Sequence, residues 1–232
     1  MSVTVRIKRR EGEDLVIDDA DWLAEAFFIL DPSSQLGGYD EWIFAADQRP
    51  DRITRSDIKA INSSMRARSS PELWTSVFNR PGKWLSGVDK SWRLFALTDR
   101  QWQADAAPAL ARCIQHLIRH GRGVSVGTKV LHIKRPELIP VCDSLVVEQL
   151  RFPAPTTGES AVAVIDHLRR EGSRQIEQLR AIQAHLQTVG LERSLVRILD
   201  GLLWASHPTT RMYPAIEMIQ RWRRSVAVSD RS

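Results

Sequence analysis

Residues 120–146 read HGRGVSVGTKVLHIKRPELIPVCDSLV, and this stretch decides how the rest of the chain is interpreted. Glycines crowd its first part, and an apolar run that ends at Asp143 fills its last part. The residues just before it carry apolar side chains at helical spacing, and residues 128–134 can form a second helix after the glycines. The pattern therefore predicts two helices joined by a short glycine turn.

A turn of this kind is suited to hold a phosphate. Backbone N–H groups point outward at the start of the second helix, where the helix dipole also favours an anion. One DNA phosphate can bind there whatever the base sequence. An ordinary turn between packed helices is the alternative interpretation. The residues expected to contact DNA are Arg122, Ser125, Val126, Gly127, Thr128, Lys134 and Arg135.

The distribution of charge supports the same expectation. The chain has 33 Lys and Arg against 28 Asp and Glu, and only six of the 33 cations are lysines. Guanidinium is the better bidentate partner for phosphate. Between residues 106 and 136 there is no acid, although six Lys or Arg and three His occur there. We expect this segment to form a basic surface for an acidic partner, with an ordinary solvated surface as the alternative.

Two parts of the stretch resemble the helix-hairpin-helix DNA glycosylases, most closely their 8-oxoguanine branch. Val126-Gly-Thr-Lys-Val130 is similar to the end of that family's hairpin. Arg135-Pro-Glu-Leu-Ile-Pro-Val-Cys-Asp-Ser-Leu-Val146 is similar to the segment that follows it. The resemblance implies a mainly α, glycosylase-like fold with a helix-hairpin-helix motif. The alternating residues near the N-terminus add a small β-hairpin to this expectation.

The wider chain is also similar to an uncharacterised bacterial protein family. That family has a Lys-Arg-Pro-x-Leu-Ile-Pro-Val-x-Asp-Ser motif, which this chain carries at residues 134–144. It also has a helix of the form Leu-x-Arg-x-Leu-Asp-x-x-Leu-Trp, which corresponds to residues 195–204. This second likeness covers more of the chain and implies no activity.

The glycosylase resemblance implies a catalytic role for Asp143. Cleavage of an N-glycosidic bond develops positive charge on the sugar, which a nearby carboxylate stabilises. The apolar residues on both sides of Asp143 would strengthen its field by excluding water. The alternative is that Asp143 only caps the helix that follows, and a capping residue can also face a substrate.

By the same resemblance, Lys129 is the amine that would attack the sugar carbon and form a Schiff base, which gives a lyase step. Such an amine needs a lowered pKa, and the cations Arg122, Lys134 and Arg135 could lower it. The interval from Lys129 to Asp143 is shorter than in the 8-oxoguanine branch, and Lys129 could instead contact a phosphate or solvent. We therefore expect a monofunctional hydrolase, with a lyase step as the alternative.

A glycosylase also flips its base out of the duplex and fills the gap. In chain order, the residues after the helix that starts near Thr54 correspond to the plug of the glycosylase family. Asn62 and Arg66 are therefore candidates for filling the gap, and Cys142 is a candidate for the pocket wall. Solvation of a helix end is the alternative for Asn62 and Arg66. The eight tryptophans could line the pocket or pack in the core.

The chain is expected to divide into a 1–52 segment with a hairpin, a helix and a loop, a helical 53–225 domain, and a frayed 226–232 tail. Residues 152–158 are a candidate linker because they hold two prolines, two threonines and a glycine. Helices are expected at 20–30, from Thr54, from Ser70, and at 99–106, 108–120, 144–151, 160–170, 173–188, 191–206 and 213–224.

Composition excludes several classes of protein. Two cysteines rule out a disulfide framework and a four-cysteine zinc site. No apolar stretch approaches the ~20 residues that cross a bilayer, and the N-terminus is too polar for a signal peptide. We expect a soluble, cytoplasmic monomer that binds double-stranded DNA. No metal or cofactor is expected, apart from a monovalent cation that the hairpin could hold.

The leading hypothesis is a DNA glycosylase that excises a damaged or modified base, bulky phage-type bases included, for repair or for defence against phage. The first alternative is a non-catalytic helix-hairpin-helix protein that binds DNA. The second alternative is a helical interaction protein whose charge only keeps it in solution.

Overall fold

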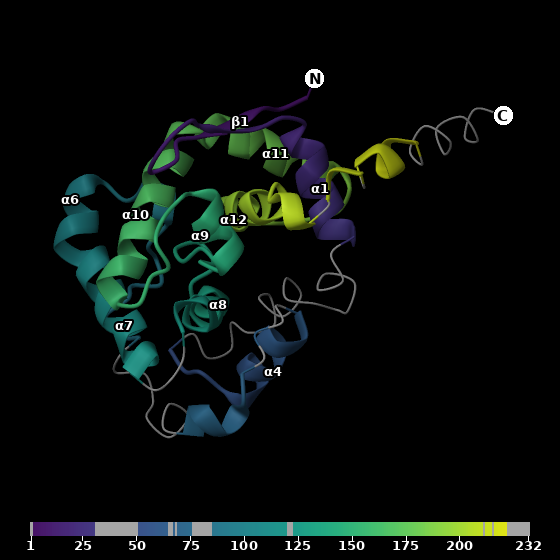
Figure 1. Ribbon diagram of the computed structural model, residues 1–232. Helices are drawn as coiled ribbons and strands as arrows, with labels where there is room; N and C mark the ends of the chain where they lie inside the picture. The colour runs from purple at the N-terminus through teal and green to yellow at the C-terminus, as the bar shows by residue number, and fades with distance from the viewer. Residues whose placement is uncertain are drawn as a thin grey trace.

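The computed structural model describes residues 2–30, 51–64, 67, 69–75, 85–119, 123–210, 212–214 and 216–221. Within these residues the chain is mainly helical, with one two-stranded antiparallel sheet (Figure 1). Among the described helices, none combines the length and the apolar character that a membrane crossing requires.

The expected N-terminal hairpin is confirmed. Strand β1 (Val5–Ile7) pairs with β2 (Leu15–Ile17), and the alternate residues of both strands are buried. In Figure 1 the hairpin is the purple pair of strands at the top. The amide of Lys8, just after β1, donates to the Glu171 carboxylate at 2.9 Å. Helix α1 (Ala20–Leu30) follows with the predicted bounds.

Helix α12 (Leu195–Ala205) lies at the centre of the fold. Helices α1, α11 (Ile176–Thr188) and α9 (Ser144–Gln149) pack around it. A Cβ at Gly201 would lie 2.8 Å from the ring of Phe27, so glycine permits this close approach of α1 and α12. The helix starts at Leu195, later than predicted, because the Ser194 side chain accepts a hydrogen bond from Arg197 and caps it.

A second group of helices lies beside this centre. Helix α6 (Asp99–Gln101) continues through a π-helical turn, η3 (Trp102–Ala106), into α7 (Ala107–Arg119). The sequence predicted a break near Pro108, but the π turn lets the helix continue. Helix α10 (Gly158–Arg174) packs against α7, and the amide of Gly158 donates to Gln115 Oε1 at 2.8 Å.

Helix α8 (Val124–Lys134) lies between α7 and α4 (Arg55–Ser64). It starts four residues earlier than predicted, because residues 124–127, which were expected in the glycine turn, form its first turn. Of the residues before it in that turn, Gly123 is described. The expected capping box of α4 is confirmed, since Thr54 and Asp57 bond each other's amides at 2.6 and 3.3 Å. Short 3₁₀ turns complete the described elements: η1 (Pro71–Trp74), η2 (Leu94–Ala96) and η4 (Pro208–Thr210).

Helix α9 ends two residues earlier than predicted, and Arg151 follows it with a left-handed φ of 57°. The candidate linker at 152–158 connects α9 to α10. Of the predicted C-terminal helix, residues 213, 214 and 216–221 are described and helical, and the expected tail lies outside the described residues. One hydrophobic cluster includes side chains from the hairpin through α12.

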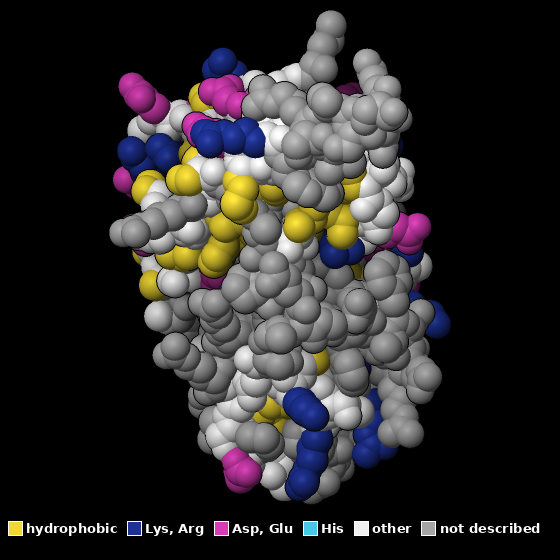
Figure 2. Space-filling view, turned by 90° about the vertical axis from the view of Figure 1, so that its right-hand side faces the viewer, with side chains coloured by type: hydrophobic (Ala, Val, Ile, Leu, Met, Phe, Trp, Pro, Cys, Tyr) yellow, Lys and Arg dark blue, Asp and Glu magenta, His cyan; other side chains and the backbone are white. Residues whose placement is uncertain are grey.

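Figure 2 shows the face of the molecule on the right-hand side of Figure 1. The described Lys and Arg side chains on this face lie apart from one another, at its upper and lower ends and toward its right side, and Asp or Glu side chains lie beside several of them. Described hydrophobic side chains gather in its upper half. The described part of this face therefore carries no continuous basic surface.

Candidate functional site

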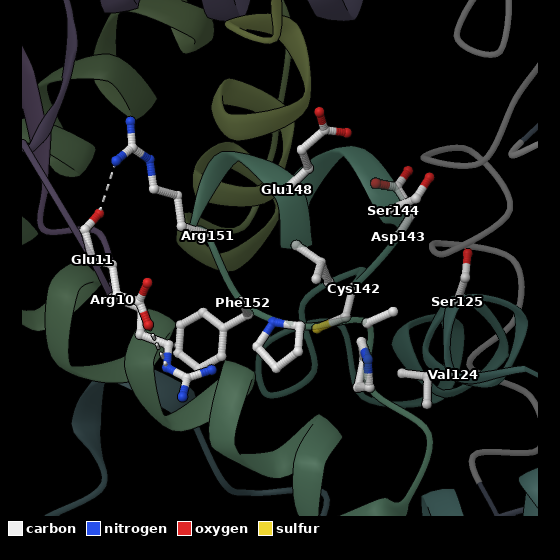
Figure 3. Close-up of a pocket in the computed structure, with 14 residues that line it drawn as sticks. Arg10, Glu11, Val124, Ser125, Cys142, Asp143, Ser144, Glu148, Arg151 and Phe152 are labelled. Atoms are coloured by element: carbon white, nitrogen blue, oxygen red, sulfur yellow. Dashed lines mark hydrogen bonds and ion pairs between the residues drawn. The ribbon is translucent and has the colours of Figure 1, made fainter.

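A cavity of about 800 Å³ opens alongside α9. The hairpin turn, the first turn of α8, α9 and the segment after α9 all contribute to its wall. Figure 3 shows that the cavity has two polar ends. Asp143, Ser144 and Ser125 lie at one end, and Arg10, Glu11 and Arg151 lie at the other. Between these ends Figure 3 shows Cys142, Phe152 and the acidic side chain of Glu148. Val147, Pro153 and Pro155 add apolar side chains to the wall.

Asp143 caps α9 and also lines the cavity. Its side chain accepts a hydrogen bond from the amide of Val146 at 3.1 Å, and its backbone is extended, as in a typical N-cap. The residue is half-buried. The two interpretations considered for Asp143 are therefore compatible in this structure, because the capping residue also lines a cavity.

The first turn of α8 meets Asp143 at the same end of the cavity. Val124 and Ser125 line the wall, and their amides precede the first hydrogen bond of the helix. That first bond runs from the amide of Gly127 to the carbonyl of Gly123 at 3.0 Å. The expectation that the Gly127 amide holds a phosphate is corrected accordingly, because this amide is already engaged within the helix. The amide of Val126 belongs to the same first turn.

Thr128, whose amide was expected near a DNA phosphate, is fully buried within α8. Its hydroxyl donates to the carbonyl of Val124 at 3.0 Å and accepts from the amide of Cys142 at 3.1 Å. Thr128 thereby joins α8 to the backbone that leads into Asp143.

Asp200 holds the same backbone one residue earlier, at Val141. Its carboxylate accepts from the amide of Val141 at 3.0 Å and pairs with Arg197 at 2.6 Å. Burial raises the pKa of Asp200 to about 6, although the Arg197 charge opposes the shift and Asp143 adds to it. Sequence reasoning missed this role, although both residues belong to the Leu-x-Arg-x-Leu-Asp motif.

Lys129 lies four residues after Ser125, on the same face of α8. It is only 9% exposed, and burial lowers the pKa of its amine. The charge of Asp143 raises this pKa and that of Arg197 lowers it further. The expected direction of the shift is therefore present, but its main cause is burial rather than the neighbouring cations suggested by the sequence.

Lys134 and Arg135 do not form the expected basic surface. Lys134 Nζ lies 2.8 Å from Asp57 Oδ2, and both side chains are 2% exposed. Arg135 donates to the carbonyl of Val88 at 2.9 Å and to Asp51 at 2.6 Å. Both cationic side chains are buried and paired with a carboxylate, which corrects the expectation that they contact DNA phosphates. Arg122 lies outside the described residues.

The weaker pocket candidates have different outcomes. Asn62 donates to the carbonyl of Ser69 at 2.7 Å and accepts from its amide at 2.8 Å, so its side chain is engaged with the backbone of Ser69 instead of filling a base gap. Arg66 lies outside the described residues. Cys142 lines the cavity and is 2% exposed, and burial raises the pKa of its thiol. Cys142 is therefore a neutral wall residue.

The aromatic side chain of the cavity is Phe152. Among the described tryptophans, Trp74 and Trp102 are buried in the core and none lines this cavity. The guanidinium of Arg10 lies 5.5 Å from the centre of the Phe152 ring. Sequence reasoning missed this wall because the prolines that follow Phe152 indicated a linker.

No group of three His, Cys, Asp or Glu residues is arranged to hold a metal ion within the described part of the chain.

Comparison with known proteins identifies the family but no activity. The chain matches a family of unknown function, DUF6308, over residues 20–207, and it belongs to that family. None of the curated proteins and none of the solved structures matches it. Asp143, Lys129, Thr128 and Asp200 lie inside the matched segment, whereas the N-terminal hairpin precedes it.

Proposed function

We propose that this protein is a DNA glycosylase that cleaves the N-glycosidic bond of a damaged or modified base, bulky phage-type bases included, in repair or in defence against phage. The observation that carries the proposal is the Asp143 carboxylate, which lines a cavity of about 800 Å³ beside the first turn of α8. An enzyme that acts on a base must take it out of the duplex into such a pocket.

In the proposed reaction, Asp143 stabilises the positive charge that develops on the sugar as the bond to the base breaks. Water then attacks the sugar carbon. Thr128 and Asp200 act as positioning residues, because they hold the two amides that precede Asp143. The free amides at the start of α8 would bind a backbone phosphate, as in a helix-hairpin-helix motif.

The proposed enzyme is monofunctional. A lyase step would need the Lys129 amine to reach the sugar carbon, and Lys129 is only 9% exposed and is not among the residues that line the cavity. The lowered pKa of Lys129 keeps the lyase step as the second candidate. The proposal further includes a cytoplasmic monomer, double-stranded DNA as the partner, and no cofactor beyond a monovalent cation at the turn before α8.

The test is base release from duplexes that each contain one modified base, such as uracil, 8-oxoguanine or a bulky modified pyrimidine. Abasic sites are cleaved with alkali after incubation. We expect release of at least one base by the wild type and none by Asp143→Asn. The matched control is Asp105→Asn, which removes an exposed carboxylate of η3 away from the cavity.

The same assay separates the alternatives. Salt-sensitive DNA binding without release of any base would replace the proposal with a non-catalytic DNA-binding protein. Absence of DNA binding at low salt would favour a helical interaction protein.

A further inference from the structure

The cavity has a second polar end that the proposed chemistry does not use. Arg10 and Glu11 come from the hairpin turn, and Arg151 follows the end of α9 (Figure 3). The amide of Arg10 donates to the carbonyl of Leu150 at 3.0 Å, which ties the turn to this end of the helix. Because the hairpin precedes the segment matched by the family, this end of the cavity is partly built outside that segment.

The backbone conformation and a hydrogen bond together fix the position of Arg151. Arg151 adopts a left-handed φ of 57°, and its guanidinium donates to the carbonyl of Glu11 at 3.3 Å. Gly12 lies against this guanidinium, and a Cβ there would displace the end of the Arg151 side chain from its present position. Gly12 itself has a φ of 78°, which favours glycine.

The distance between the two ends limits what can reach both. Asp143 caps α9 and Arg151 lies just after its last turn, so their backbones are separated by about 12 Å along the helix axis. A bare pyrimidine ring attached to a sugar beside Asp143 is shorter than this distance. A base that contacts both ends of the cavity would therefore carry a substituent that extends past Cys142 and Phe152 toward Arg10 and Arg151.

The groups at this end select the chemistry of that substituent. Arg10 and Arg151 only donate hydrogen bonds, whereas the Glu11 carboxylate, 4.0 Å from Arg10 Nε, only accepts them. A hydroxyl both donates and accepts, so it satisfies both kinds of group. A carboxylate or phosphate on the substituent would be attracted by the arginines but repelled by Glu11. The Phe152 ring offers an apolar face to the carbons between the hydroxyls.

We propose that the base accepted by this cavity carries a hydroxyl-bearing, sugar-like substituent, recognised by Arg10, Glu11 and Arg151. This inference rests on the proposed function because it names the substrate class of the same cavity. It makes the N-terminal hairpin a specificity element rather than only part of the core.

The test measures DNA affinity by fluorescence anisotropy, with all variants in the Asp143→Asn background. The probes are duplexes that contain cytosine, 5-hydroxymethylcytosine, glucosylated 5-hydroxymethylcytosine or 5-carboxycytosine at one position. We expect the glucosylated duplex to bind at least about tenfold more tightly than the cytosine duplex. We expect this preference to fall in each of three variants, Arg10→Ala, Glu11→Gln and Arg151→Gly. Glycine is chosen at residue 151 because it suits the left-handed backbone there.

The matched control is Arg180→Ala, which removes an exposed arginine paired with Glu177 on α11. Thermal unfolding verifies that each variant is folded. Equal affinity of the wild-type hairpin for all four duplexes would overturn the inference, as would a preference for 5-carboxycytosine. The inference would also be overturned if the arginine variants lost the same affinity for every duplex and their binding depended less on salt. That result would mean that these arginines contact backbone phosphates.

The two proposals fail in different ways. Base release from an unsubstituted duplex, without any preference in binding, would contradict the inference and leave the glycosylase proposal intact. A hairpin-dependent preference for the glucosylated duplex, with no base released by protein that retains Asp143, would contradict the glycosylase proposal and leave the recognition of the substituent intact.

Discussion

The hydroxyl of Thr128 accepts a hydrogen bond from the backbone amide of Cys142 at 3.1 Å, in the buried interface between α8 and the segment that leads to Asp143. The same hydroxyl donates to the carbonyl of Val124 at 3.0 Å. One side chain therefore fixes the distance between the first turn of α8 and the residue before Asp143, at the end of the cavity where the reaction is proposed.

Thr128→Val tests this relationship because valine keeps the shape and removes the hydroxyl. The amide of Cys142 would stay buried without its acceptor, so we expect the free energy of unfolding to fall by about 1–3 kcal/mol. Base release should also slow. Urea denaturation and the release assay measure the two effects. Thr188→Val is the control, since it removes an exposed hydroxyl that donates to His185. Equal stability of the two variants would contradict the role of Thr128.

The buried pair of Lys134 and Asp57 gives a second prediction. Lys134→Ala leaves the Asp57 carboxylate buried without its cation, and we expect a loss of about 3–5 kcal/mol in the free energy of unfolding. The control Lys90→Ala removes an exposed lysine and should change it by less than about 0.5 kcal/mol. The double variant Lys134→Met with Asp57→Asn should recover part of the loss, because asparagine can still accept from Thr54. If Lys134→Ala leaves the free energy of unfolding unchanged and weakens DNA binding, Lys134 contacts DNA instead of stabilising the core.

His132 predicts how stability depends on pH. Burial lowers its pKa from 6.5 to about 3, with Arg197 adding to the shift, while its Nδ1 donates to the carbonyl of Ile139. The unfolded chain binds a proton below about pH 6.5 and the folded chain does so only near pH 3. Stability should therefore fall as the pH decreases through this window, by up to about 1.4 kcal/mol per pH unit.

The measurement for His132 is urea denaturation of the wild type and His132→Gln at pH 7, 6 and 5. Protonation of Asp200, between pH 3.8 and about 6, changes the free energy of unfolding in the opposite direction, but Asp200 is present in both proteins. The difference between the two curves thus isolates His132, and we expect the variant to lose less stability toward acid. Parallel curves would contradict this assignment.

Gly158 predicts a packing effect. A Cβ there would lie 2.1 Å from the carbonyl oxygen of Ala111, so Gly158→Ala must push α10 away from α7. We expect a loss of about 1–3 kcal/mol in the free energy of unfolding. Gly87→Ala is the control because its Cβ would meet no atom within 4 Å. If both variants unfold at the same urea concentration, the close contact between α7 and α10 is incorrect.

The sequence predicted elements whose signals are local. The alternation in the hairpin and the Thr54 capping box both lie within a few residues, and both elements form as expected. The start of α8 was missed because Gly127 suggested a turn. In the structure Gly127 is a helical residue of α8, and the packing of α8 against α7 and α4 overrides the weak helix propensity of glycine.

The candidate site was predictable only in part. The position of Asp143 at a helix start follows from its neighbours, but its position in a cavity depends on the hairpin, which is remote in the chain. The basic character of Lys134 and Arg135 was misinterpreted for the same reason. Their partners, Asp57 and Asp51, are distant in sequence, so a charge run without local acids looked like an exposed surface.

The central claim is that Asp143 acts on the substrate and does not only cap α9. Asparagine caps a helix about as well as aspartate but carries no charge. The most direct measurement is the single-turnover rate of base release by Asp143→Asn, with its free energy of unfolding determined in parallel. We expect the rate to fall at least about 100-fold while stability stays within about 0.5 kcal/mol of the wild type. Base release at the wild-type rate by the equally stable variant would contradict the claim.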